Sequence, residues 1–245
     1  MRLIVNADDF GMTDGVTQGI LNAMRHGMVS STTMMVNMPG TKNAAMEIRR
    51  DPGIAAGLHV NISIGRPLTH CPSLTRNGAF QKPGAWGGDE SYDEEELYRE
   101  ILAQYNAFEE LTGKRPTHAD SHLYTHQKFP KVRSAVMRLA GEMGIPVRDG
   151  QAAGQIAAVF EGRFKLAPGE TAEQLKEKCK MLLRELAAYP LAELMVHPAF
   201  ADHWLMTHSS YHLQRTAEHA VLTDPEMMAY MASLGIIRAT YQDVG

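Results

Sequence analysis

The chain has 245 residues, of which 44% are hydrophobic and 21% charged, and a formal net charge of -4. This length can bury a full core but is short for two large domains, so we expect one domain over residues 1–245. The charge balance lacks the basic stripe of a nucleic-acid binder, and no run approaches the about 18 apolar residues of a membrane span. We therefore expect a cytoplasmic protein without a signal peptide, a nucleic-acid partner or a membrane partner.

Short apolar runs alternate with longer amphipathic ones along the chain, which is typical of βα units. The predicted strands, in chain order, cover 3–6, 32–37, 55–61, 117–120, 145–148, 193–197 and 236–239, with 157–160 as a candidate eighth. Apolar residues at steps of three or four predict helices over 16–24, 97–108, 132–143 and 175–186. We expect an α/β fold, a TIM-barrel-like (β/α) barrel of seven or eight parallel strands that is complete, distorted or incomplete. An open doubly wound sheet is the alternative.

Two stretches, residues 63–92 and 199–223, interrupt this alternation. The first is rich in glycine and proline, and the second is polar. Loops of this length inside a compact domain are usually functional or disordered, so we expect both to be long loops. Their aromatic residues could stack on a ligand or simply pack against the protein; these are Trp86, Tyr92, Trp204 and Tyr211.

The strand ends carry most of the notable polar residues. Asp8 and Asp9 follow the first strand, and two of the later strands end near His59 and His197. The strand at 117–120 ends in Asp120, with His122 and His126 soon after it. A barrel would bring these strand ends together on one face.

Adjacent carboxylates at the end of a buried strand need an explanation, because burying uncompensated charge is costly. A bound cation would compensate them, with one of Asp8 and Asp9 as a ligand and the other free to accept a proton. The structural alternative is that one of them caps the following helix, a role that Thr13 or Asp14 could share.

A single histidine at a strand end is usually a hydrogen-bonded structural residue, but three at equivalent places favour a metal site. Imidazole and carboxylate ligands suit Zn, Fe, Mn or Ni, and two His with one Asp leave room for water and substrate. Asp120 is placed to support the site by fixing an imidazole, while His126 could lie near the metal or begin the next helix. We expect the remaining histidines on the surface or in loops; these are His26, His70, His118, His203, His208, His212 and His219.

Four short motifs together resemble the YdjC-like carbohydrate deacetylase family, which includes chitooligosaccharide (chitin disaccharide) deacetylases. The motifs are NADDFG at 6–11, GLH at 57–59, DSH at 120–122 with His126, and HPA at 197–199. The resemblance covers essentially the whole chain and implies a (β/α) barrel, often a homodimer. It also implies one divalent metal ion, magnesium or plausibly zinc, held by Asp9, His59 and His122, with Asp8 as the general base.

The chain departs from the family's pattern at one position. Family members often carry Asp-Ser-His-x-His-x-His, whereas Tyr124 replaces the middle histidine here. This departure bears on which sugar or metal the protein prefers. The segment with Tyr211 and Arg215 resembles the family's C-terminal loop, which implies that it borders the substrate cleft.

Amide hydrolysis requires an activated water, a Lewis acid for the carbonyl, a base, and an acid for the leaving amine. The predicted metal site, Asp8, and either His197 or His126 as the acid would supply these functions for a small acetylated saccharide. Two other functions stay open on the sequence alone. One is an Fe or Mn oxygenase or isomerase with two His and one Asp, and the other is a non-catalytic saccharide-binding protein.

Overall fold

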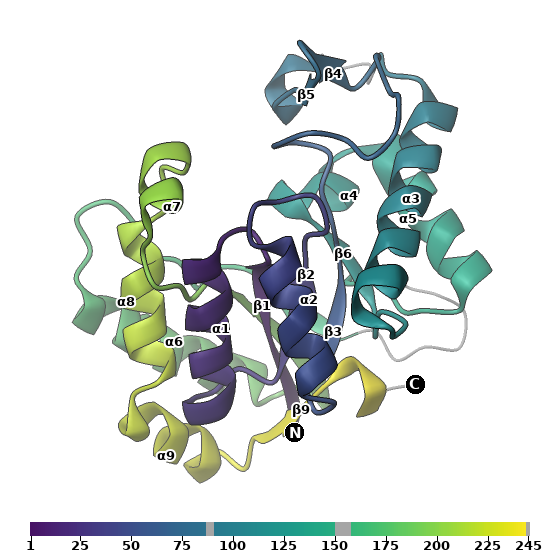
Figure 1. Ribbon diagram of the computed structural model, residues 1–245. Coiled ribbons are helices and arrows are strands. Elements are labelled where there is room, and N and C mark those ends of the chain that lie inside the picture. Colours follow the sequence, from purple (N-terminus) through teal and green to yellow (C-terminus); the bar gives the residue numbers. More distant parts are fainter. Residues whose placement is uncertain (87–90, 150–157, 244–245) are drawn as a thin grey trace.

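The computed structural model describes residues 1–86, 91–149 and 158–243. Seven strands of these residues form one curled, all-parallel sheet in the order β6-β3-β2-β1-β8-β7, with β9 paired to β1 (Figure 1). The strands are β1 (Arg2–Phe10), β2 (Ser31–Met34), β3 (Ala56–Val60), β6 (Ala119–Ser121), β7 (Val159–Glu161), β8 (Leu191–Val196) and β9 (Ile237–Ala239). The prediction of a distorted or incomplete parallel barrel is confirmed.

Strand β1 lies at the centre of this sheet. Its residues 2–7 pair with β8 along one edge, while β9 and β2 share the other edge. The register between β1 and β2 shifts between Ala7 and Phe10. The regular pairing of β1 is therefore interrupted where the sequence carries its two adjacent carboxylates.

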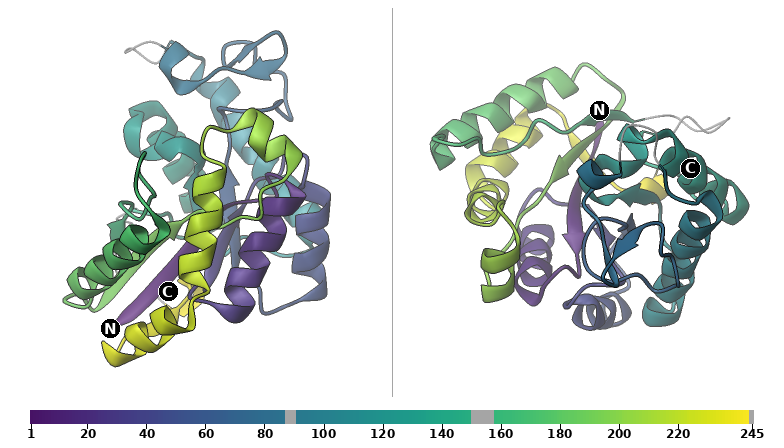
Figure 2. Two further views of the ribbon diagram at one scale, coloured as in Figure 1. Left: turned by 90° about the vertical axis from the view of Figure 1, so that its left-hand side faces the viewer. Right: turned by 90° about the horizontal axis from the view of Figure 1, so that it is seen from above.

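Helices cover the outer side of the curled sheet, as the view from above shows (Figure 2). The longer ones are α1 (Asp14–His26), α2 (Thr41–Arg50), α3 (Glu94–Thr112), α5 (Pro130–Met143), α6 (Ala172–Leu186), α8 (Leu213–Leu222) and α9 (Pro225–Ser233). Thr13 caps α1, because its side chain accepts a hydrogen bond from the Val16 N–H. Asp8 and Asp9 are therefore not needed as caps for this helix.

The stretch expected as a loop at 63–92 contains a small antiparallel hairpin, β4 (Thr75–Arg76) with β5 (Ala79–Phe80), and the short 3-10 helix η1 (Pro83–Ala85). It rises above the sheet at the top of Figure 1. The buried carboxylate of Glu100 on α3 anchors it by accepting the N–H groups of Leu68 and Thr69. Trp86 packs edge-on against the rings of Tyr92 and Phe129, which makes it a packing residue.

The prediction of a loop at 199–223 is wrong for most of that stretch, because it forms α7 (His203–His208) and α8. Asp202 caps α7 by accepting the Leu205 N–H. The buried face of α8 contains Arg215 and Glu218 beside its apolar residues. These buried charges hide the helical periodicity from a reading based on hydrophobicity.

The predicted strand at 145–148 is also wrong, because Val147 forms only an isolated parallel bridge with Ala119. Pro146 has no N–H to donate, so it contributes only its carbonyl, which accepts the Ala119 N–H. At the candidate eighth strand, β7 begins at Val159, and residue 157 lies outside the described residues.

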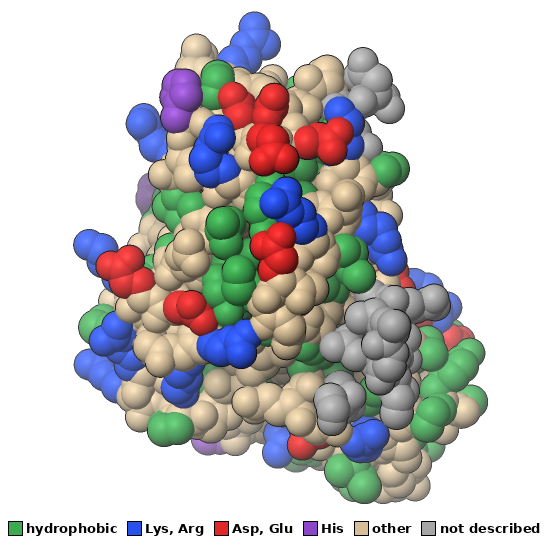
Figure 3. Space-filling view, turned by 90° about the vertical axis from the view of Figure 1, so that its right-hand side faces the viewer, with side chains coloured by type: hydrophobic (Ala, Val, Ile, Leu, Met, Phe, Trp, Pro, Cys, Tyr) green, Lys and Arg blue, Asp and Glu red, His purple; other side chains and the backbone are tan. Residues whose placement is uncertain are grey.

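Side chains of opposite charge lie close together on the face formed by α3 and α5 (Figure 3). Arg138 on α5, for example, pairs with Glu142 at 3.0 Å and lies over the ring of Tyr98 from α3. Among the described helices, none is long and apolar enough to cross a membrane.

Candidate active site

The polar ends of β1, β3, β6 and β8 line one cavity of about 480 Å³. The cavity lies at the carboxyl ends of the strands, and residues of the 63–92 segment and of α7 contribute to its lining. It brings together most of the residues singled out in the sequence, namely Asp8, Asp9, His59, His122, His197, Tyr211 and Arg215. Asp120 is buried behind this wall.

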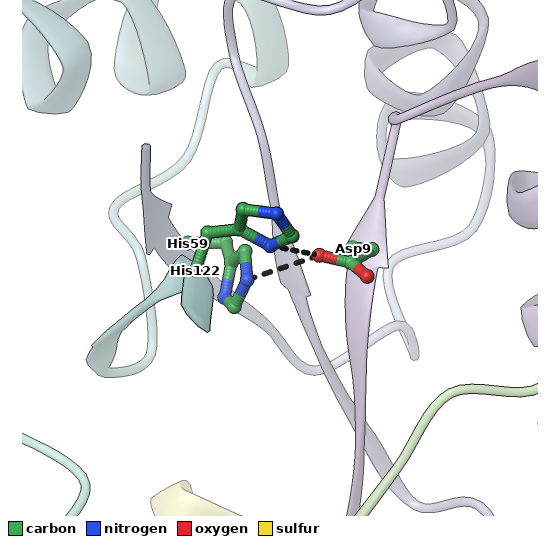
Figure 4. Close-up of side chains that lie close together, drawn as sticks. All are labelled: Asp9, His59 and His122. Atoms are coloured by element: carbon green, nitrogen blue, oxygen red, sulfur yellow. Dashed lines mark hydrogen bonds and ion pairs between the residues drawn. The ribbon is translucent and has the colours of Figure 1, made fainter. Parts of the chain in front are cut away.

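Asp9 faces the imidazole rings of His59 and His122 (Figure 4). Its backbone has a φ of 72°, which places a non-glycine residue in the left-handed region at the irregular end of β1. Asp9 Oδ1 accepts a hydrogen bond from His122 Nδ1 at 2.8 Å, and Oδ2 accepts one from Arg215 at 2.6 Å. Burial opposes ionisation of this carboxyl, but His122 and Arg215 hold its pKa well below its usual range.

His59 is oriented by its neighbour in the sheet. Its Cα is in register with that of Asp120 on the adjacent strand, and its Nδ1 donates to Asp120 Oδ1 at 2.6 Å. The other ring nitrogen, Nε2, is therefore turned toward Asp9 Oδ1, at 3.1 Å. Burial alone would lower the pKa of His59, but Asp120 raises it to about 10.

Asp9, His59 and His122 fit a divalent metal ion. Each can offer one ligand atom, and these atoms lie within 4.8 Å of one another. His59 Nε2 is buried and forms no aligned hydrogen bond with a described atom, so it can serve as a ligand once a metal ion displaces its proton. A ligating histidine whose other nitrogen is held by a carboxylate is the usual arrangement around a protein-bound metal, and Asp120 provides that carboxylate.

Asp8 has a different partner from its neighbour. Its two carboxylate oxygens accept hydrogen bonds from the two terminal nitrogens of Arg148, at 2.6 and 2.7 Å. Asn6 Nδ2 donates a further hydrogen bond to Asp8 at 2.9 Å. A bidentate pair of this kind fixes the orientation of a carboxylate as well as its charge.

His197 follows β8 and lines the cavity. Its backbone N–H donates to the buried carboxylate of Glu218, and its Nδ1 lies 4.0 Å from the same group. Burial and the nearby Arg215 lower the pKa of His197 to about 3, so the ring is neutral at neutral pH.

Both ring nitrogens of His126 are already engaged. Burial lowers its pKa to about 4, so the ring is neutral. Nε2 donates to the carbonyl of Arg148 at 3.1 Å, and Nδ1 accepts from the Ser121 hydroxyl at 2.6 Å. His126 is thus held in place behind the cavity and lies in the short helix α4 (Thr125–Lys128).

Tyr211 and Arg215 connect α8 and the segment before it to the site. The Tyr211 hydroxyl donates to Glu218 and accepts the Leu166 N–H at 3.0 Å. Arg215 donates to Asp9 and, through Nε, to the Tyr211 carbonyl. Trp204 also lines the cavity, where its ring stacks on His208.

Tyr124 follows His122 in the 3-10 helix η2 (His122–Tyr124), and both Leu123 and Tyr124 have positive φ angles. Its hydroxyl accepts a hydrogen bond from Lys165, and both side chains line the cavity. Burial lowers the pKa of Lys165 and raises that of Tyr124 to about 12. The residue that departs from the family pattern therefore lies in the cavity wall.

Among the other histidines, His118 lies in the irregular segment directly before β6, as a loop position would have it, but it is not on the surface. Its ring is fully buried and stacks on Tyr241 with a centroid distance of 3.7 Å. Burial lowers its pKa to about 3.

No sequence motif pointed to Arg148, Lys165 or Glu193 as residues of the site. Glu193 had a usable signal, because a carboxylate inside the apolar run of β8 needs a buried partner. Arg148 had a weaker one, as an arginine ending an apolar segment. Lys165 had no such signal in its local sequence, whereas Glu218 belongs to the segment that resembles the family's C-terminal loop.

Comparisons with known proteins point to one family. A family model described as YdjC-like protein matches residues 2–233. Carbohydrate deacetylase 2 from Listeria innocua serovar 6a is 34% identical, covering 100% of this chain and 99% of its own. A carbohydrate deacetylase from Geobacillus stearothermophilus is 39% identical, covering 98% and 96%.

Solved structures show the same fold. A protein of Enterococcus faecalis V583, described as a candidate cellobiose-phosphate cleavage protein, has a TM-score of 0.87 and 29% identity, covering 99% of this chain and 98% of that one. The catalytic domain of a peptidoglycan N-acetylglucosamine deacetylase from Eubacterium rectale has a TM-score of 0.56 at 12% identity, covering 98% and 87%, and it shares the fold alone. By its family match and its full-length relatives, the chain belongs to the YdjC-like protein family.

Proposed function

We propose that this protein is a metal-dependent hydrolase that removes acetyl groups from small N-acetylated sugars, such as chitooligosaccharides. The observation that carries the proposal is that two adjacent carboxylates in one cavity bind different partners. Asp9 lies against two histidines, while Asp8 is held apart by Arg148 in the same cavity. The full-length relatives named carbohydrate deacetylases support it.

Asp9, His59 and His122 would hold the metal ion, with Asp120 orienting His59. We propose Mg²⁺ from the family resemblance; two imidazoles with one carboxylate also suit Zn²⁺. When bound, such an ion polarises a carbonyl and lowers the pKa of water. Arg215 holds Oδ2 of Asp9 and leaves Oδ1 on the side of the two histidines.

Asp8 would act as the general base that accepts the proton of the attacking water. Arg148 holds both of its oxygens, so the carboxylate cannot rotate away from the cavity. A fixed base within hydrogen-bond reach of its proton is the first requirement of general base catalysis.

His197 would protonate the leaving nitrogen of the sugar. Because its pKa is about 3, the ring is neutral before the reaction, so the proton it delivers would be the one that Asp8 takes from the attacking water. A group with such a pKa is a strong acid once it is protonated. We assign this role to His197 because both ring nitrogens of His126 are engaged elsewhere.

Tyr211, Arg215 and Lys165 would border the sugar in the cavity. We further propose that residues 1–245 act as one deacetylase domain in a cytoplasmic homodimer. An oxygenase or isomerase with two His and one Asp would not require a separately held carboxylate such as Asp8. This feature favours hydrolysis.

The test is acetate release from a panel of N-acetylated saccharides by the purified protein, compared with its Asp9→Asn variant under several divalent metals. The proposal predicts metal-dependent release by the parent and a strong loss in the variant. Tight saccharide binding without acetate release under any of the metals would support a binding protein instead.

A further inference from the structure

Arg148 connects three strands across the inside of the incomplete barrel. It lies in the segment after α5, at the open side of the sheet, where only Val147 forms a bridge to β6. Its guanidinium pairs with Asp8 from β1, Asp120 from β6 and Glu193 from β8, at distances of 2.6 to 2.9 Å. The Arg148 side chain is 1% exposed, so the guanidinium is shielded from solvent.

One guanidinium cannot neutralise three carboxylates, so the cluster depends on further donors. Glu193 has such a further donor besides Arg148, namely the Tyr241 hydroxyl. Its Oε1 accepts from Arg148 Nε at 2.7 Å, and its Oε2 accepts from the Tyr241 hydroxyl. Burial raises the pKa of Glu193 to about 7, and the Tyr241 hydrogen bond opposes that rise.

Tyr241 comes from the last described element, the 3-10 helix η3 (Tyr241–Asp243). It lies beyond residue 233, where the match to the family model ends. Its ring is 6% exposed and stacks on His118, which directly precedes β6. Through Glu193 and Arg148, Tyr241 therefore belongs to the same cluster as Asp8, the proposed base.

We propose that Tyr241 is a positioning residue for the reaction: through Glu193 it fixes the Arg148 guanidinium, and through Arg148 it fixes the Asp8 carboxylate. This inference rests on the proposed function, in which Asp8 is the base.

The planar guanidinium of Arg148 explains how the Tyr241 hydroxyl can affect Asp8 without contacting it. The Nε and the two terminal nitrogens of Arg148 lie in one rigid plane, so the Glu193 contact at Nε sets the direction in which the other two point. Without the Tyr241 hydroxyl, Glu193 loses the partner of Oε2 and can rotate. The guanidinium plane then tilts, and its two-point contact with Asp8 is weakened.

The experiment compares Tyr241→Phe with a matched control, Tyr98→Phe. Tyr241→Phe keeps the ring that stacks on His118 and removes only the hydroxyl. Tyr98 also donates its hydroxyl to a glutamate, Glu142, but on the outer helices α3 and α5. Steady-state kinetics of acetate release from an N-acetylated disaccharide and the hydrogen exchange of the Arg148 Nε–H, followed by NMR, are measured for each protein.

We expect Tyr241→Phe to lower kcat about 10-fold with little change in KM, because a misplaced base costs rate and not binding. The Arg148 Nε–H should exchange at least about 10-fold faster in this variant. Tyr98→Phe should change neither quantity. Glu193→Gln, whose amide can still accept from Arg148, should retain more activity than Glu193→Ala.

Equal kcat losses in the two tyrosine variants, or unchanged Arg148 Nε–H exchange in Tyr241→Phe, would overturn the inference. An absence of acetate release from the parent would instead contradict the proposed function. In that case the exchange measurement would still decide whether Tyr241 positions Arg148.

Discussion

Asp8 and Asp9 are consecutive residues whose carboxylates bind different partners. Asp8 forms a two-point ion pair with Arg148, whereas Asp9 accepts hydrogen bonds from His122 and Arg215. The positive φ of Asp9 and the register shift at the end of β1 accompany this separation. In a regular strand, the side chains of two consecutive residues point to opposite faces of the sheet. Asp8 and Asp9 instead both line one cavity while they bind different partners.

Replacing Asp8 with Asn should abolish most of the activity without removing the metal. The variant lacks the proton acceptor, so we expect kcat to fall by about 10² to 10⁴-fold. Metal content, measured by elemental analysis, should match that of the parent because Asp8 is not among the proposed ligands. Asp14→Asn, at an exposed position, is the control. A variant that keeps its activity would remove Asp8 from the proposed mechanism.

Replacing Asp120 with Asn should weaken metal binding although Asp120 is not a proposed ligand. The carboxylate holds Nδ1 of His59, accepts a hydrogen bond from Thr33 and forms an ion pair with Arg148, so its loss frees the imidazole to rotate. We expect the affinity for the metal to fall by about 10 to 100-fold, as measured by competition with a chelator. An unchanged affinity would show that His59 is oriented by other contacts.

Substrates with different leaving groups can distinguish a catalytic role of His197 as a proton donor from a structural role. A sugar amine must be protonated as it leaves, whereas a 4-nitrophenolate need not be. We expect His197→Gln to lower kcat on an N-acetylated sugar by about 100-fold and to change the hydrolysis of 4-nitrophenyl acetate by about 3-fold or less. Equal losses on both substrates would indicate that His197 supports the structure of the site.

His118 should make the folded protein less stable in acid. Burial lowers its pKa to about 3 in the folded state, against an ordinary value of 6.5. Between these values the unfolded chain binds more protons, so the free energy of unfolding falls as the pH falls. The contribution is about 1.4 kcal/mol for each pH unit below 6.5.

His118→Phe keeps a ring against Tyr241 and removes the titrating group. Urea unfolding at pH 6.5 and pH 5 should therefore show a smaller loss of stability for this variant than for the parent. His26→Phe, at an exposed position, is the control. Parallel losses in His118→Phe and the parent would show that other groups cause the acid sensitivity.

The strand pattern and the strand-end motifs predicted most of the sheet and the gathering of their polar residues around one cavity. Apolar runs ending in Asp9, His59 or His197 were sufficient because parallel strands bring their carboxyl ends together. The helix α8 was missed because Arg215 and Glu218 lie on its buried face, where a hydrophobic pattern expects apolar residues. The strand expected at 145–148 failed because only one of its residues pairs.

The residues that hold the site residues in place were harder to predict from the sequence. Arg148 lies 140 residues from Asp8, and Tyr241 lies 48 residues from Glu193, so no local pattern links either pair. Such contacts depend on how the strands curl around the interior, which short motifs do not encode. The burial of His118 was missed for the same reason, since its partner Tyr241 comes from the end of the chain.

The central claim is that Asp9, His59 and His122 hold a metal ion required to release acetate from N-acetylated sugars. The most direct test strips the purified protein of metal with a chelator and measures acetate release before and after single divalent metals are restored. We expect stripping to abolish release and restored metal to recover it with one bound ion per chain in the parent, but neither binding nor recovery in His59→Gln. Full acetate release by the stripped protein, or recovery in His59→Gln equal to that of the parent, would contradict the claim.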